Sequence, residues 1–189
     1  MPAQLPLGVE AAYRRADAVG FVLSCEPGVG QLLAALAAAV PLDGRVLELG
    51  TGVGVGLSWF VHGLGDRTDV NVVTVDADNS VIDVARAARW PGYVRFELED
   101  GVQALKRLGS FDLIFADAPA GKVVGLRHTI TALRPGGVLV VDDMDLDRHD
   151  DLDLRDALAT VRRRLLDEPA LQCVELDHAS GIIVAARRR

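Results

Sequence analysis

Val46–Gly56 reads VLELGTGVGVG, an apolar run that holds a single acid, Glu48, and continues into four glycines at every second position. The residues that follow, Leu57–Val61, read LSWFV and are expected to begin a helix. A buried strand that passes through a glycine turn into a helix is how α/β proteins bring their backbone against a nucleotide. Glycine suits this turn because it takes positive φ freely and has no Cβ between the backbone and a ligand. The stretch therefore predicts a nucleotide-binding turn.

The composition is that of an ordinary globular protein. The chain has 189 residues, of which 50% are hydrophobic and 25% charged, and this size fits one domain with one substantial core. The formal charge of −7 argues against a nucleic-acid partner, because neutralising phosphates requires a basic face. The arginine clusters are Arg162–Arg164 and Arg187–Arg189, and we interpret them as a solvated helix face and a solvated tail.

The sequence gives no indication of membrane insertion or of cysteine chemistry. No apolar run is long enough to span a bilayer, and the N-terminus lacks a basic segment followed by an apolar one, so we expect no membrane partner and a cytoplasmic location. Cys25 and Cys173 lie far apart, outside any CxxC pattern, and are interpreted as small apolar residues.

Short apolar runs alternate with helical patterns along the chain. The expected strands are 45–49, 70–75, 93–98, 111–116, 138–141, 171–176 and 182–186. The expected helices are 8–23, 27–40, 57–64, 79–90, 102–108, 122–133 and 152–166. This alternation requires right-handed crossovers and a parallel sheet, and the last two strands form an antiparallel hairpin. The sequence therefore predicts one α/β domain over 1–189, with a helical N-terminal segment (1–42) and a core (43–189).

Carboxylates follow the five strands that are expected to be parallel. Because parallel strands bind ligands at their carboxyl ends, these acids are expected to meet at one edge of the sheet. Asp76 lies 26 residues beyond Gly50, about where an acid accepts hydrogen bonds from ribose hydroxyls. Mutual repulsion among the carboxylates at this edge would lower the stability of the fold unless a ligand, a cation or hydrogen-bond donors offset it. The acids are Glu48, Asp76, Asp100, Asp117 and the pair Asp142 and Asp143.

Five motifs together resemble those of the class I S-adenosylmethionine-dependent methyltransferases. They are VLELGTGVGV (46–55), VVTVDAD (72–78), EDG (99–101), FDLIFADAP (111–119) and LRPGGVLVVDD (133–143). They occur in the family's order, and SCEPGVGQLL (24–33) with the terminal hairpin extends the likeness to most of the chain. The closest resemblance is to the catechol O-methyltransferase-like branch. It implies a Rossmann-like, doubly wound, seven-stranded and mostly parallel sheet with helices on both faces.

The resemblance also implies where the cofactor S-adenosylmethionine would bind. Glu48 and the loop residues Gly50, Thr51, Gly52 and Gly54 would contact its methionine part. Asp76, with Ala77 beside it, would hold the ribose. Asp100 and Gly101 would line the adenine, and Asp117 would lie near the sulfonium.

In metal-using relatives, the acid after the fourth strand and the pair after the fifth bind Mg²⁺ or Ca²⁺. The matching positions are Asp117, Asp142 and Asp143, three oxygen ligands of the kind that hard divalent cations take. Asp143 replaces the family's usual amide. The family commonly has a lysine three residues after the first acid, where this chain has Ala120, and Lys122 comes two residues later.

These observations predict methyl transfer from S-adenosylmethionine to a small-molecule acceptor, most simply at a hydroxyl oxygen, with a divalent cation assisting. Asp117, Lys122 and His149 are the candidate catalytic residues, the last two as alternative bases. The resemblance also suggests a homodimer with the apolar first helix at the contact. Two alternatives from other classes are a nicotinamide-dependent oxidoreductase and a binding module without activity; the residues Glu48 and GxGxG count against the oxidoreductase.

Overall fold

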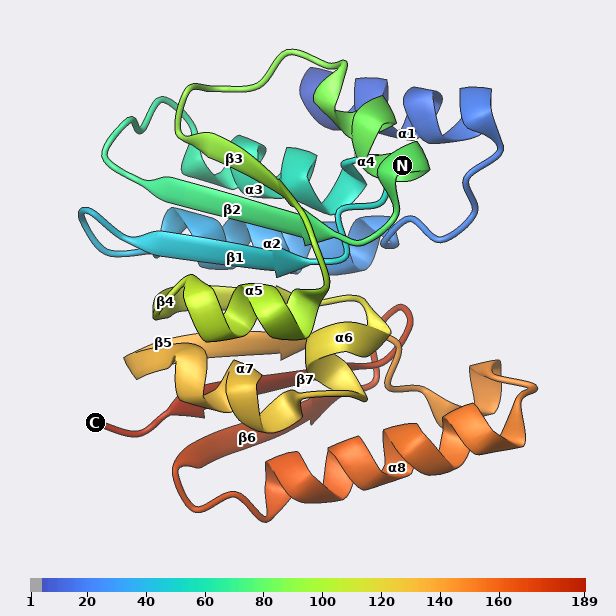
Figure 1. The fold of residues 1–189 in the computed structure, drawn as a ribbon, viewed down its shortest axis with the longest axis vertical. Coiled ribbons are helices and arrows are strands. Elements are labelled where there is room, and N and C mark those ends of the chain that lie inside the picture. The colour runs from blue at the N-terminus through green and yellow to red at the C-terminus, as the bar shows by residue number, and fades with distance from the viewer. Residues whose placement is uncertain (1–4) are drawn as a thin grey trace.

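The computed structural model describes residues 5–189 and contains one seven-stranded sheet (Figure 1). The strand order is β3-β2-β1-β4-β5-β7-β6; β7 is antiparallel to its neighbours β5 and β6, and every other pair is parallel. The predicted α/β fold with an antiparallel terminal hairpin is therefore confirmed. The strands are β1 (Arg45–Leu49), β2 (Asn71–Asp76), β3 (Val94–Leu98), β4 (Phe111–Ala116), β5 (Leu133–Val141), β6 (Leu171–Leu176) and β7 (Ile182–Arg187).

Helices cover both faces of this sheet, which is why the central strands are almost continuously apolar. In Figure 1, α5 to α8 lie in front of the sheet and α2 and α3 lie behind it. One core joins α5, α7 and α8 to the front face, and a second joins α1, α2 and α3 to the other. The helices are α1 (Leu7–Val19), α2 (Pro27–Ala38), α3 (Val55–Leu64), α4 (Asn79–Arg86), α5 (Gly101–Arg107), α6 (Pro119–Lys122), α7 (Leu126–Ala132), the 3-10 turn η1 (Leu146–Arg148) and α8 (Leu152–Leu166).

Several predicted boundaries were wrong. The helix expected over 122–133 is two short helices, because Gly125 takes a left-handed conformation with φ of +84° and α7 begins only after it. The strand expected over 138–141 begins at Leu133, which pairs with Phe111 before a shift in register. The first helix ends at Val19, since Gly20 takes a left-handed cap, and α4 ends at Arg86 rather than near Trp90.

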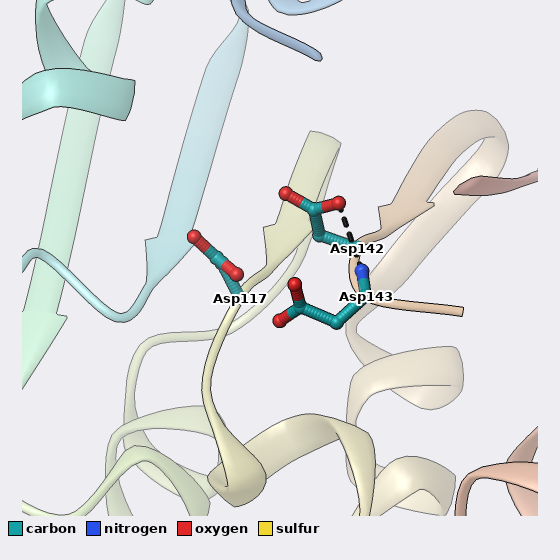
Figure 2. A group of neighbouring side chains, drawn as sticks. All are labelled: Asp117, Asp142 and Asp143. Carbon is teal, nitrogen blue, oxygen red and sulfur yellow. Dashed lines mark hydrogen bonds between the residues drawn. The ribbon is translucent and has the colours of Figure 1, made fainter. Parts of the chain in front are cut away.

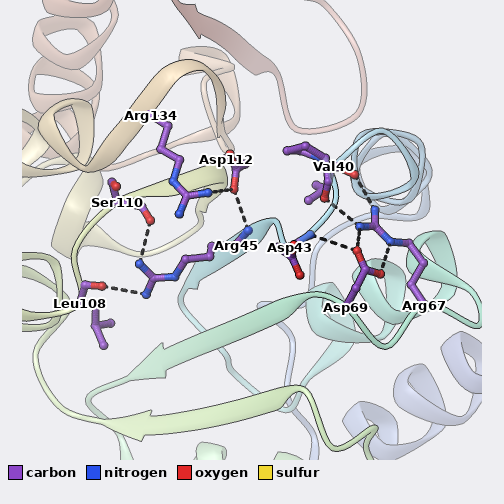
Figure 3. Close-up of polar contacts among 10 residues, drawn as sticks. Val40, Asp43, Arg45, Arg67, Asp69, Leu108, Ser110, Asp112 and Arg134 are labelled. Carbon is purple, nitrogen blue, oxygen red and sulfur yellow. Dashed lines mark hydrogen bonds and ion pairs between the residues drawn. The ribbon is translucent and has the colours of Figure 1, made fainter.

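Arginine side chains fasten the amino ends of the strands (Figure 3). Arg45 donates to the carbonyl oxygens of Ser110 (2.9 Å) and Leu108 (2.8 Å). The Asp112 carboxylate accepts from the Arg45 backbone N–H and from Arg134, both at 2.7 Å. These contacts tie β1, β4 and β5 together at the edge opposite their carboxyl ends. Among residues 5–189, no helix combines the length and apolarity needed to cross a bilayer.

Helices α2 and α3 pack so closely that Gly63 has no room for a side chain. A Cβ at Gly63 would lie 2.1 Å from the carbonyl oxygen of Ala34 and 2.6 Å from its Cα. We therefore expect Gly63→Ala to lower the free energy of unfolding by about 1–3 kcal/mol, the usual cost of overpacking. Urea denaturation measures this change. Gly8→Ala is the control, because a Cβ there meets nothing within 4 Å and should be neutral or slightly stabilising; equal effects of the two substitutions would contradict the close packing.

Candidate functional site

Three adjoining cavities lie along the carboxyl ends of the parallel strands. The first, of about 240 Å³, is lined by the glycine loop, Glu48 and the segment Phe21–Cys25. The second, of about 470 Å³, contains the acidic cluster Asp117, Asp142 and Asp143. The third, of about 540 Å³, is lined by Asp76, Ala77 and Gly101 among others. Asp117 lines the first two cavities and Asp76 lines the first and third, so one ligand can extend through adjoining spaces.

The glycine loop requires glycine for steric as well as conformational reasons. Gly50, Gly52 and Gly54 have φ of +100°, +50° and +85°. A Cβ at Gly50 would lie 2.6 Å from the carbonyl oxygen of Asp117, and one at Gly52 would lie 2.8 Å from the Phe21 ring. Thr51 in the same loop is buried, and its hydroxyl lies 2.6 Å from the hydroxyl of Thr74. The loop therefore presents its backbone directly to the first cavity.

Glu48 is fully buried beneath this loop. Its Oε2 accepts a hydrogen bond from the Thr74 hydroxyl at 2.5 Å, whereas its Oε1 has no hydrogen-bond partner within residues 5–189. Burial is the main cause that raises the pKa of Glu48 from 4.5 to about 8; the charge of Asp76 raises it further, and the Thr74 hydrogen bond opposes both. A buried carboxyl with one unsatisfied oxygen at a cavity wall suits a ligand that carries a hydrogen-bond donor or a positive charge.

Asp76 connects the glycine loop to the turn after β2. Its two carboxylate oxygens accept from the backbone N–H of Gly52 at 2.8 Å and of Asp78 at 3.0 Å. Asp100 has a different position. Its exposed side chain caps α5 by accepting from the N–H groups of Val102 and Gln103 at 3.0 Å, while the neighbouring Gly101 lines the third cavity.

The three predicted metal ligands do come together (Figure 2). Asp117, Asp142 and Asp143 each offer an oxygen atom, and these atoms lie within 4.8 Å of one another. Burial, followed by the charges of Asp142 and Asp143, raises the pKa of Asp117 well above its usual value. Burial also raises the pKa of Asp142 to about 6, although the Ser180 hydroxyl donates to its Oδ1. Such crowding of carboxylates favours a nearby positive charge.

Lys122 supplies one such charge. It is only 5% exposed, and its Nζ donates to the Asp142 carbonyl oxygen at 3.1 Å and to Asp143 Oδ2 at 3.2 Å. Its backbone is directed there by Gly121, whose φ is +90° and whose carbonyl accepts from Thr129 at 2.6 Å. Lys122 therefore reaches the acidic cluster although it lies two positions later than the resemblance led us to expect. His149 also lines this cavity, with Nε2 3.0 Å from the Asp143 carbonyl oxygen.

Comparison with known proteins identifies the group to which these features belong. A family described as "Methyltransferase domain" matches residues 47–144. A protein of Mycolicibacterium smegmatis named "Putative O-methyltransferase" is 32% identical over 95% of this chain and 90% of its own length. The chain belongs to this methyltransferase family. The resemblance to class I S-adenosylmethionine-dependent methyltransferases is thereby confirmed, and the oxidoreductase alternative is not supported.

Solved structures agree with the methyltransferase fold. An O-methyltransferase from Bacillus cereus in complex with SAH has a TM-score of 0.85 at 20% identity, covering 100% of this chain and 94% of the other. The O-methyltransferase TomG from Streptomyces achromogenes, in complex with SAM, has a TM-score of 0.82 at 20% identity and covers 100% of this chain and 93% of the other.

The sequence did not predict some of the residues that line the first two cavities. Ser180 lies in the turn between β6 and β7, and its hydroxyl donates to Asp142, but the segment around it indicated only a turn. Cys25 is buried and lines two cavities, where burial and then Asp117 raise the pKa of its thiol. Arg148 was missed as well: it lines the second cavity and forms an ion pair of 2.5 Å with Glu26, and nothing in their sequence spacing predicts that the two meet.

The raised pKa of Glu48 predicts a pH dependence of stability. Between about pH 4.5 and 8 this carboxyl is protonated in the folded methyltransferase and ionised in the unfolded chain, so stability without ligand falls as pH rises. Glu48→Gln removes this contribution. We therefore expect the free energy of unfolding of Glu48→Gln at pH 8 to exceed that of wild type by on the order of 2–4 kcal/mol. At pH 4.5 the two proteins should have about the same free energy of unfolding.

Urea titrations at both pH values measure this difference, and Glu10→Gln on α1 is the matched control for loss of a carboxylate outside the cavities. If wild type and Glu48→Gln showed the same change of stability with pH, Glu48 would be ionised in the folded protein and the expectation would be wrong.

Proposed function

We propose that this protein transfers the methyl group of S-adenosylmethionine to a hydroxyl oxygen of a small-molecule acceptor. The observation that carries the proposal is the shared wall between two cavities. Asp117 lies between the glycine-loop cavity, which contains the unsatisfied Glu48 Oε1, and the cavity that contains the acidic cluster and Lys122. The names of the relatives support transfer to oxygen.

The residues of the first and third cavities fit the cofactor. Glu48 Oε1 suits its ammonium group, and the loop Gly50–Gly54, with Thr51 and Gly52, offers the close backbone approach that a Cβ would prevent. Asp76 and Ala77 are assigned to the ribose and Gly101 to the adenine side, whereas Asp100, which lines neither cavity, would act there only by capping α5 beside Gly101. When bound, S-adenosylmethionine supplies a methyl carbon already activated by its sulfonium. The chain's part is to hold acceptor and donor in line, which supplies much of the rate in a displacement of this kind.

The acidic cluster fits a divalent cation. Asp117, Asp142 and Asp143 provide hard oxygen donors within 4.8 Å of one another, the ligand type that Mg²⁺ and Ca²⁺ prefer. When bound, such an ion lowers the pKa of a hydroxyl that coordinates it. Ser180 and the Asp143 N–H hold Asp142 in place through its Oδ1.

Lys122 is the proposed base for the acceptor hydroxyl, and His149 is the second candidate. Both line the second cavity, but only the Lys122 side chain contacts a carboxylate of the cluster, at 3.2 Å from Asp143. Val22, Leu23, Leu154 and Leu158 line the same cavity and favour an acceptor with an apolar body.

The base assignment predicts a large kinetic effect of Lys122→Met. With S-adenosylmethionine and a panel of catechols and other small phenols, wild type is expected to form S-adenosylhomocysteine. Loss of a general base should lower kcat by about 10²–10⁴-fold. The affinity for S-adenosylhomocysteine, measured by calorimetry, should stay within about 3-fold because the lysine lies outside the glycine-loop cavity.

Lys106→Met on α5 is the matched control and should retain wild-type turnover. Full activity in Lys122→Met together with loss in His149→Ala would transfer the role of base to His149. Absence of binding heat for both S-adenosylmethionine and S-adenosylhomocysteine would contradict the proposed cofactor.

The cation assignment predicts that Mg²⁺ or Ca²⁺ binds in calorimetry and that a chelator stops turnover. Asp143→Ala should lower the affinity for the ion by about 10–100-fold, a typical loss when a metal site is disturbed. Asp145→Ala is the control, because Asp145 caps η1 and lies outside the cluster. If the chelator did not change the turnover rate and Asp143→Ala were fully active, the metal would have no part in the mechanism.

The proposal includes a cytoplasmic homodimer. Leu7 of α1 is 82% exposed, and packing of α1 against a second copy of the chain would cover this side chain. Light scattering of wild type and of Leu7→Lys tests the contact.

A further inference from the structure

A fourth cavity lies away from the three described above. It has a volume of about 650 Å³ and lies among α7, α8 and β7, and none of its residues lines the cavities at the carboxyl edge. Figure 1 shows α7 and α8 on the same side of the sheet, in front of β7 and β6. Leu126 and Ile130 contribute apolar surface, and Arg127, Arg164 and Arg187 contribute charge. We name this cavity the arginine groove.

The structure brings together arginines that are far apart in the sequence. Arg164 comes from the first arginine cluster, Arg187 from the second, and Arg127 from neither. Arg164 is exposed, as expected of a solvated helix face, whereas Arg187 is half-buried and so is not part of a solvated tail. Its one carboxylate is Glu168, whose Oε1 accepts from the Ala170 N–H at 3.2 Å. Three guanidinium groups thus face one carboxylate in a chain whose net charge is −7.

These guanidinium groups lack acidic partners. Within residues 5–189, neither Arg127 nor Arg164 forms an ion pair or a side-chain hydrogen bond, although Arg155 and Arg162 on the same helix α8 pair with Asp147 and Glu175. Arg187 is half-buried and fixed, because its Nη1 donates to the carbonyl oxygens of Thr131 and Leu133. Concentrated positive charge without a protein counter-ion favours an anion from solution.

We propose that the arginine groove binds a small polyanion, a molecule with two or more phosphate or carboxylate groups. The planar guanidinium fork matches both groups in a bidentate way. The volume is that of a metabolite-sized site, and the apolar side of the groove can contact a carbon skeleton. The groove lies toward the amino edge of the sheet: Arg187 is the last residue of the antiparallel β7, whose partner β5 runs to the acidic cluster at its other end.

Calorimetry at constant ionic strength tests this site, with sodium pyrophosphate and sodium citrate as probes and without divalent cations. The protein is first saturated with S-adenosylhomocysteine. At least one probe should bind at one site per chain. Arg127→Gln and Arg164→Gln should each weaken it by about 10-fold, as expected for loss of a charge-assisted contact. Binding of pyrophosphate alone would assign the site to phosphates, and binding of citrate alone would assign it to carboxylates.

Arg163→Gln is the matched control. It removes the same charge from the neighbouring position of α8, where the side chain lies outside the groove, and should change the affinity by less than 2-fold. Arg127 and Arg164 are exposed, so both substitutions should leave folding intact. The proposal is overturned if neither probe binds, or if Arg163→Gln weakens binding as much as Arg164→Gln does.

Discussion

The burial of carboxylates at the carboxyl edge of the sheet is the constraint on which the site depends. Glu48 and Asp142 are almost inaccessible to water, and burial is the largest cause of the raised pKa of each. Charged groups in such places are costly unless they are paired or protonated. The surrounding donors partly offset this cost: Thr74 bonds Glu48, Ser180 bonds Asp142, and Lys122 bonds Asp143. These donors leave Glu48 Oε1 without a hydrogen-bond partner in the described part of the chain, and the proposed cofactor would supply a donor there.

The lysine of the acidic cluster illustrates how geometry can replace sequence spacing. Counted along the chain, Lys122 lies too far from Asp117 to match the family's pattern. The intervening loop absorbs the extra residues: Ala120 is extended and Gly121 is left-handed, so the chain turns back and α6 ends with its lysine directed at Asp142 and Asp143. A Cβ at Gly121 would lie 2.3 Å from the Leu49 side chain, which restricts this turn to glycine. The lysine therefore reaches the acidic cluster even though its spacing from Asp117 in the sequence does not match the expected one.

The sequence predicted the strands and the acids that follow them, because buried parallel strands are apolar runs whose ends are marked by polar residues. It did not predict contacts that depend on non-local folding. Asp143 has a φ of +59°, a conformation that Asp and Asn tolerate, and no local pattern announces it. Ser180 reaches Asp142 from 38 residues away. The predicted helix ends were also imprecise. Gly20 ends α1 and Gly125 precedes α7, each in a left-handed conformation that glycine can adopt but that the sequence does not require.

Opposite charges are separated along the strands of this acidic protein. At the carboxyl edge, burial and then the charges of Asp142, Asp143 and Glu48 raise the pKa of Asp117, and the field there favours cationic groups such as a sulfonium, an ammonium or a divalent ion. At the amino edge, Arg134 forms an ion pair with Asp112, the Arg45 guanidinium donates to backbone carbonyl oxygens, and the arginine groove adds guanidinium groups without acidic partners. Because like charges repel over the short distances within a cavity, a polyanion is disfavoured at the acidic cluster and favoured in the groove. The same sheet, in which every strand except β7 points its carboxyl end the same way, therefore provides two edges with opposite preferences for ligand charge.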